Sequence, residues 1–282
     1  MNQTRIICAS FASVLSLSSL AFALDIQVGD VQDSRTTGQF FSGLTVDLKM
    51  VGDELNDASG VKVNIASALD DTGRDLLNPE EKKDTFEDLK QFGQTQNKVS
   101  LKLKNPARRA NTIKELKGQL ELYVPKNDPA SKVTVNDLSK QGGKPIESQA
   151  FKDAGVQLTL MTSQQYEAEK KKQADAAAAE AKAKGMPPEM LNMMNSLSMG
   201  MGSDDANSLI MKVTDPNNRL VEVTVLGTDG QPIRSNGSMS SGDTKTLYFE
   251  QKIPDGAKVE IALATPKSLM VVPLNLQNIA LP

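Results

Sequence analysis

The chain contains no histidine and no tryptophan, and its one cysteine is Cys8. Without histidine there is no Ser-His-Asp or Cys-His nucleophilic site, no imidazole acid–base catalysis and no His-ligated zinc. Gly142-Gly143-Lys144 is glycine-rich, but it lacks the spacing and the following helix of a phosphate-binding P-loop. We therefore expect a protein that is not an enzyme and that carries no cofactor.

The first 23 residues have the three parts of a cleavable signal peptide. Residues 1–5 form a short positive start, residues 6–20 are apolar or small, and Ala21 and Ala23 of Ala21-Phe22-Ala23 offer the small side chains that a signal peptidase accepts. Cys8 lies inside this segment rather than at the cleavage point, so we expect no lipid anchor and no thiol in the mature chain. The prediction is an exported protein, periplasmic or extracellular, with no membrane span after cleavage.

The charged residues are mixed along the chain rather than gathered by sign. The formal net charge is −3, from 32 basic and 35 acidic residues. Proteins that bind nucleic acid usually carry a basic patch or stripe, which this sequence lacks. We therefore expect no nucleic-acid partner.

Short segments in which apolar and polar residues alternate predict half-buried β-strands. Turn residues separate them, as in Asp70–Gly73 and Thr228–Gly230. The segments are 44–48, 61–65, 99–103, 120–124 and 133–135 in the first half, and 156–160, 209–213, 220–225, 247–249, 259–263 and 270–276 in the second. This spacing predicts antiparallel sheets rather than a βαβ fold.

The two halves are similar enough to suggest a weak internal duplication with a joint near residues 142–154. We predict two domains, residues 24–147 and 148–282. By its strand spacing and turns, the chain resembles tandem immunoglobulin-like or fibronectin-like domains of secreted bacterial proteins. The resemblance implies a mainly β fold of two antiparallel Ig-like β-sandwich domains. It implies no particular function, and the cysteine pair and tryptophan of antibody domains are absent.

Two segments interrupt the strand pattern and predict helices. Residues 78–81 combine a capping asparagine, a proline at the first helical position and acidic residues in the first turn. They predict a short helix over about 79–92, on which Phe86 and Leu89 share a face. A longer segment, about 163–204, begins rich in alanine, glutamate and lysine without an apolar stripe. We expect it to form a helical hairpin insertion that projects from the second domain.

The second part of this insertion is rich in methionine: residues 186–201 hold half of the chain's 12 methionines. Met190, Met193, Met194 and Leu197 have helical spacing and predict a flexible apolar face. This face would fill gaps against the protein's own core, or contact a partner protein or a second copy. Thioethers also bind Cu(I), so Met190, Met193 and Met194 are candidate ligands in a copper-binding alternative.

Acidic residues cluster at the first glycine turn, where Asp70, Asp71 and Asp75 lie, and again at Asp204 and Asp205. Paired carboxylates suit a glycosidase or a calcium site, so a carboxylate-dependent hydrolase is a second alternative. Aspartates at turns more often accept backbone hydrogen bonds. We therefore expect a non-enzymatic, exported binding or structural module of the cell envelope or periplasm that contacts a partner protein through its Met-rich helical arm.

Overall fold

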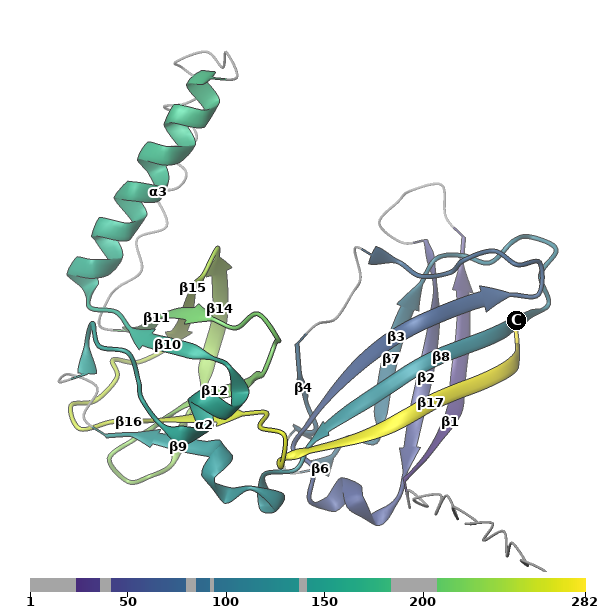
Figure 1. Cartoon of the computed structure of the whole chain (residues 1–282), viewed down its shortest axis with the longest axis horizontal. Coiled ribbons are helices and arrows are strands. Elements are labelled where there is room, and N and C mark those ends of the chain that lie inside the picture. Colours follow the sequence, from purple (N-terminus) through teal and green to yellow (C-terminus); the bar gives the residue numbers. More distant parts are fainter. Residues whose placement is uncertain (1–23, 36–41, 80–84, 92–93, 137–140, 184–206) are drawn as a thin grey trace, which may run out of the picture.

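The protein is mainly β, and its sheets are antiparallel. The computed structural model describes residues 24–35, 42–79, 85–91, 94–136, 141–183 and 207–282. In Figure 1 two β units lie side by side. Each unit has its own hydrophobic core, to which both of its main sheets contribute. No helix in these described ranges is long and apolar enough to cross a membrane.

The first unit combines a sheet ordered β1-β2-β7 with a sheet ordered β17-β8-β3-β4. Its strands are β1 (Asp25–Ser34), β2 (Gly43–Val51), β3 (Gly60–Asp70), β4 (Glu87–Asp88), β7 (Lys98–Leu103), β8 (Thr112–Tyr123) and β17 (Leu269–Ala280). Alternate side chains of both sheets, among them Leu48, Leu101 and Leu120, are buried in one core. The 3-10 helix η2 (Asp53–Asn56) and the ribbon of β5 (Lys90–Gln91) and β6 (Gln94–Thr95) complete this unit.

The second unit combines a sheet ordered β10-β11-β15-β14 with a sheet ordered β13-β12-β16-β9. Its strands are β9 (Lys132–Val135), β10 (Gln157–Leu160), β11 (Ser208–Thr214), β12 (Leu220–Leu226), β13 (Pro232–Ile233), β14 (Ser235–Ser241), β15 (Thr244–Phe249) and β16 (Lys258–Leu263). The short helix α2 (Gln149–Ala154) adds Phe151 to the core. Ser148 caps its first turn and Gly155, with φ 70°, ends it in the left-handed region.

The two units exchange their final strands. In each half the third strand, β3 or β12, pairs with the second-to-last strand, β8 or β16. The last strand of the first half, β9, then crosses over to pair with β16, whereas β17 returns to pair with β8 along its whole length. The predicted division into 24–147 and 148–282 stays a prediction, and it separates β9 from its partner β16 and β17 from its partner β8. The internal duplication itself stays a prediction.

The turns that follow β3 and β12 have the same backbone hydrogen bonds. Gly73 donates to Asp70 O at 3.0 Å, and Gly230 donates to Gly227 O at 3.0 Å. The N–H of the residue that opens each turn also donates to the carbonyl oxygen four positions later, from Asp70 to Arg74 and from Gly227 to Gln231. The two glycines have φ values of 86° and 77°, a region that suits glycine, so the two sequences reach one turn geometry.

Two connections join the units and run next to each other. One follows β8 through the 3-10 helices η4 (Pro125–Asn127) and η5 (Pro129–Ser131), and the other links β16 to β17. The Val124 N–H donates to Ser268 O at 2.7 Å, and the Thr265 hydroxyl donates to the Asp128 carboxylate at 2.6 Å. Because the connections bond to each other, they restrain the second unit more firmly than one linker would.

Polar and apolar contacts fill the junction between the units. Lys62 of β3 contacts Glu121 of β8 at 3.1 Å, and Arg219 of the second unit contacts the same carboxylate at 3.3 Å. Lys62 also donates to Asn218 O at 3.3 Å and lies 4.9 Å from the centre of the Phe86 ring. The side chains of Lys62 and Glu121 are almost fully buried, so each charge depends on the other for compensation.

The two predicted helices have different outcomes. The prediction of a helix over about 79–92 is wrong for residues 85–91, which form β4 and β5 instead. Phe86 packs against Tyr123 at the junction of the units, whereas Leu89 packs in the first core, so the two side chains share no helix face. The second prediction corresponds to α3 (Ser163–Ala183), which lies between β10 and β11 and extends away from the sheets in Figure 1. Residues 184–206 lie outside the described residues.

Candidate functional site

One side of the first unit brings together the ends of its two sheets, β7 of one and β3 with β4 of the other. β7 ends its sheet, and no strand in the described ranges pairs with its outer edge. Backbone bonds bracket this edge, because Gln96 donates to Leu89 O at one end and Lys104 donates to Leu76 O at the other. On the opposite sheet, β4 covers β3 only at Gly60 and Val61. The six residues of β7 offer an edge of about 20 Å.

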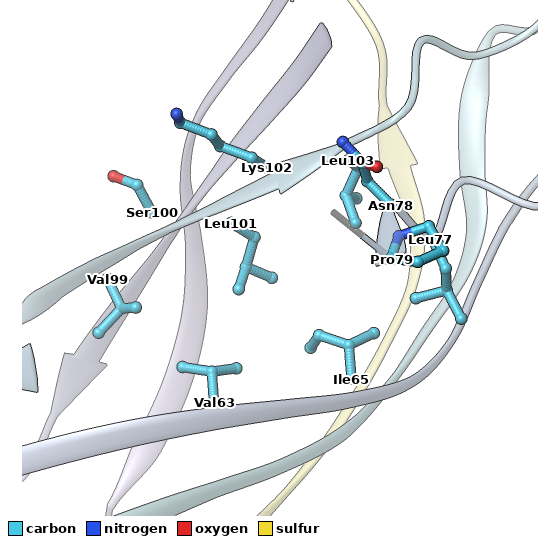
Figure 2. A pocket seen from close by; sticks show the side chains of 10 residues that line it. All are labelled: Val63, Ile65, Leu77, Asn78, Pro79, Val99, Ser100, Leu101, Lys102 and Leu103. Atoms are coloured by element: carbon cyan, nitrogen blue, oxygen red, sulfur yellow. The ribbon is translucent and has the colours of Figure 1, made fainter. Parts of the chain in front are cut away.

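An apolar groove lies between these two edges, with a volume of about 250 Å³. Figure 2 shows Val63 and Ile65 pointing from β3 toward Val99 and Leu101 of β7. Leu77 and Pro79 close one end of the hollow. The alternation along each strand produces this lining, because every second side chain of β3 and β7 faces inward.

The outward side of β7 is basic. Ser100 and Lys102 point away from the groove in Figure 2, and Lys98 shares their face of the strand. Lys98 is paired with Asp47 of β2 at 2.5 Å, and the Ser100 hydroxyl donates to the same carboxylate at 2.6 Å. Burial raises the pKa of Asp47, but these two hydrogen bonds outweigh burial and lower it below the usual value. An apolar groove thus has a rim that carries lysine.

In the second unit, a further strand pairs with the edge that corresponds to the outer edge of β7. There, β15 occupies the place in its sheet that β7 occupies in the first unit, after two strands that pair in the same order. β14 pairs with the outer edge of β15 from Ser235 to Ser241. The described part of the first unit has no counterpart of β14, and the groove opens at that place.

The carboxylates of the acidic turn, which the sequence analysis gave as candidate catalytic groups, accept hydrogen bonds from backbone N–H groups. Asp70 is fully buried and its carboxylate accepts hydrogen bonds from the N–H groups of Thr72, Arg74 and Ala107, each at 2.9 Å. Burial raises the pKa of Asp70, but these donors together with the Thr72 hydroxyl lower it to about 2. Asp71 and Asp75 likewise accept backbone N–H groups at 3.0 Å. The turn therefore anchors the chain between β7 and β8 to the end of β3.

The residues predicted to bind a partner or copper are not part of this groove as described. Met190, Met193, Met194 and Leu197 lie outside the described residues, as do Asp204 and Asp205. Their roles as a contact face or as Cu(I) ligands stay predictions. Among the described residues, no group of three or more acidic side chains is placed to hold a metal ion.

Sequence reasoning identified the groove residues as strand residues but missed the groove. The segments 61–65 and 99–103 alternate as core strands, and alternation does not show whether a neighbouring strand covers the edge. A signal was present in Lys98-Val99-Ser100-Leu101-Lys102, because lysines on the outward positions are typical of edge strands.

Comparisons of the chain with protein-family models, with curated proteins and with solved structures find no match.

Proposed function

We propose that the protein is an exported, non-enzymatic binding module that takes an apolar polypeptide segment of a partner protein into the groove between β3 and β7. The observation that supports this proposal is the apolar groove, which lies between β7 and the part of β3 that β4 does not cover. Each unit is proposed to be an immunoglobulin-like or fibronectin-like sandwich, which would present this groove on a rigid scaffold. Export from the cell follows from the proposed signal peptide.

The size of the groove favours a peptide over a small-molecule ligand. Pockets for small molecules and cofactors commonly measure about 300–1,000 Å³ and enclose most of their ligand. This groove measures about 250 Å³ and opens along the strands, which suits two or three apolar side chains of an extended chain. The side chains that face it are mostly aliphatic, and the side chain of Lys102 at its rim points away from it.

A peptide selection tests this function directly. Random eight-residue peptides displayed on phage are selected against the mature protein, and the enriched peptides are titrated into isotope-labelled protein. We expect the methyl resonances of Val63, Ile65 and Leu101 to shift. The substitution Val63→Phe fills the groove and should weaken binding at least tenfold. Val271→Phe is the matched control, because Val271 is 41% exposed on β17. Binding that survives Val63→Phe unchanged would contradict the proposal.

The Met-rich segment is a second candidate contact, and the position of α3 favours it. This 21-residue helix extends from the second unit and leads directly into residues 184–206. A helix without an apolar stripe gains little by packing on its own domain, so it suits the role of a spacer. On this candidate function, Met190, Met193, Met194 and Leu197 would contact the partner or a second copy.

A further inference from the structure

We propose that Asn236 is a site of spontaneous covalent modification, at which its side chain closes onto the backbone nitrogen of Gly237. Both residues lie in β14, the last strand of its sheet in the second unit. The inference goes beyond the proposed function, and it does not depend on the groove of the first unit.

The reaction needs only these two residues and water. The Gly237 nitrogen forms a bond with the side-chain carbonyl carbon of Asn236, and the bond from that carbon to the amide nitrogen breaks. The Gly237 N–H proton leaves with this nitrogen as ammonia. Water then opens the succinimide ring at either of its two carbonyl groups. The products are aspartate and isoaspartate, each with one new carboxylate and with no change in oxidation state.

The sequence singles out this position, because Asn236 is the only asparagine of the chain that is followed by glycine. A side chain on the following residue hinders approach to its nitrogen. Glycine has no side chain, and its backbone adopts the conformations that ring closure needs. The space beside Gly237 is also open, since a Cβ added there would have no atom within 4 Å apart from its chain neighbours.

The fold leaves Asn236 without a partner across the sheet. Ser235 pairs with Phe249 and Gly237 pairs with Tyr248, so Asn236 is the extra residue of a β-bulge. A bulge interrupts the ladder and bends the strand, which loosens the restraint that regular pairing places on a residue. Asn236 and Gly237 are both exposed, and no described residue forms a hydrogen bond with the side-chain amide. The carboxamide is therefore open to water.

Asn275 of β17 is a matched asparagine within the same molecule. It is also exposed and lies in a strand at the end of its sheet. Leu276 follows it, however, and it pairs regularly with Lys117 of β8. Its rate of modification measures what exposure contributes without the glycine and the bulge.

The rates are measured by incubating the mature protein at about pH 8 in water labelled with oxygen-18 and mapping its peptides by mass spectrometry. We expect Asn236 to gain about 3 Da at least ten times faster than Asn275. The rate should fall at least tenfold at about pH 6, because the attacking nitrogen must lose its proton. Isoaspartate, measured by methyl transfer from S-adenosylmethionine with an isoaspartyl methyltransferase, should form most of the product.

The variant Gly237→Ala keeps Asn236 and adds one methyl group beside the attacking nitrogen. Alanine fits at this position, because the φ of Gly237 is not positive and the space beside it is open. Urea denaturation should therefore match the wild type, while the rate at Asn236 falls at least fivefold. An unchanged rate in this variant, or equal rates at Asn236 and Asn275, would overturn the proposal. Modification of Asn236 only in the urea-unfolded protein would overturn it as well.

Discussion

Asp70 holds two separate loops with one carboxylate. Its oxygens accept N–H groups from Thr72 and Arg74 in its own turn and from Ala107 in the connection between β7 and β8. Because the side chain is fully buried, a donor left without its acceptor has no water to replace it. One residue therefore ties the end of β3 to a segment more than thirty positions away in the chain.

Asp70→Asn should lower the free energy of unfolding by about 2–3 kcal/mol, because its amide group would face the Ala107 N–H as a second donor. The depressed pKa also predicts a pH dependence. The carboxylate stabilises the fold fully above the ordinary value of 3.8, and this contribution is lost as the pH falls through about 2. Urea denaturation at several pH values between 5 and 2 should show this loss in the wild type. In the Asn variant the free energy of unfolding should not fall in this way between pH 5 and 2. The same pH dependence in both proteins would contradict the stabilising role of the Asp70 carboxylate.

At the scale of elements, α3 is joined to the second unit through a strand pair that does not depend on it. Leu160 of β10 lies directly opposite Met211 of β11, and the Met161 N–H donates to Ile210 O at 2.9 Å. The hairpin is thus already closed at the point where α3 begins. The alanine-rich sequence of α3 supports the helix by intrinsic propensity rather than by burial.

Replacing residues 163–206 with a four-residue Gly/Ser linker should change the free energy of unfolding by less than about 1 kcal/mol, because the helix has no apolar stripe to withdraw from the core. Urea denaturation followed by circular dichroism checks this expectation. Binding of the groove-selected peptides should also persist in the deletion variant.

A full-length variant with leucine at positions 190, 193 and 194 separates the Met-rich hypotheses, because leucine keeps the apolar surface and removes the sulfur. Cu(I) titration of this variant should show no loss relative to the wild type if the methionines serve as a contact face. Loss of copper binding would instead support the metal alternative.

At the scale of the whole molecule, the second unit is inserted between two strands that pair with each other. Tyr123 of β8 lies directly opposite Leu269 of β17, so the first unit is continuous in space although the chain leaves it and returns. The buried contacts of Lys62, Glu121 and Arg219 then fix the second unit against the first.

A single-unit protein made of residues 24–124 joined to residues 268–282 by an Asn-Gly turn should unfold cooperatively in urea, because it restores the β8–β17 hairpin. Residues 24–147 alone should show no cooperative transition, since they lack β17 and leave one edge of β8 without its partner. β9 has four residues against the twelve of β17, so it replaces little of that pairing. Equal stability of the two proteins would contradict the exchange of strands as a requirement for folding.

The sequence by itself determined which segments become strands and where many of the turns fall. Alternation identified residues 61–65 and 99–103, and the turn at Asp70 was predicted from the same local pattern, because side-chain direction and turn geometry depend on neighbouring residues. The helix prediction was wrong at residues 85–91 because Phe86 and Leu89 pack into different clusters, and tertiary contacts overrode a local capping signal.

The tertiary structure alone decided which strands pair across the units and where a groove opens. The pairing of β17 with β8 joins residues more than a hundred positions apart, and no local pattern distinguishes β8 from β16 as its partner. The groove lies where no described strand pairs with the outer edge of β7 and where β4 pairs with only the first two residues of β3, and alternation within a strand does not show how far its neighbours extend. Local sequence thus determined the elements, whereas long-range packing determined the exchange of strands and the candidate site.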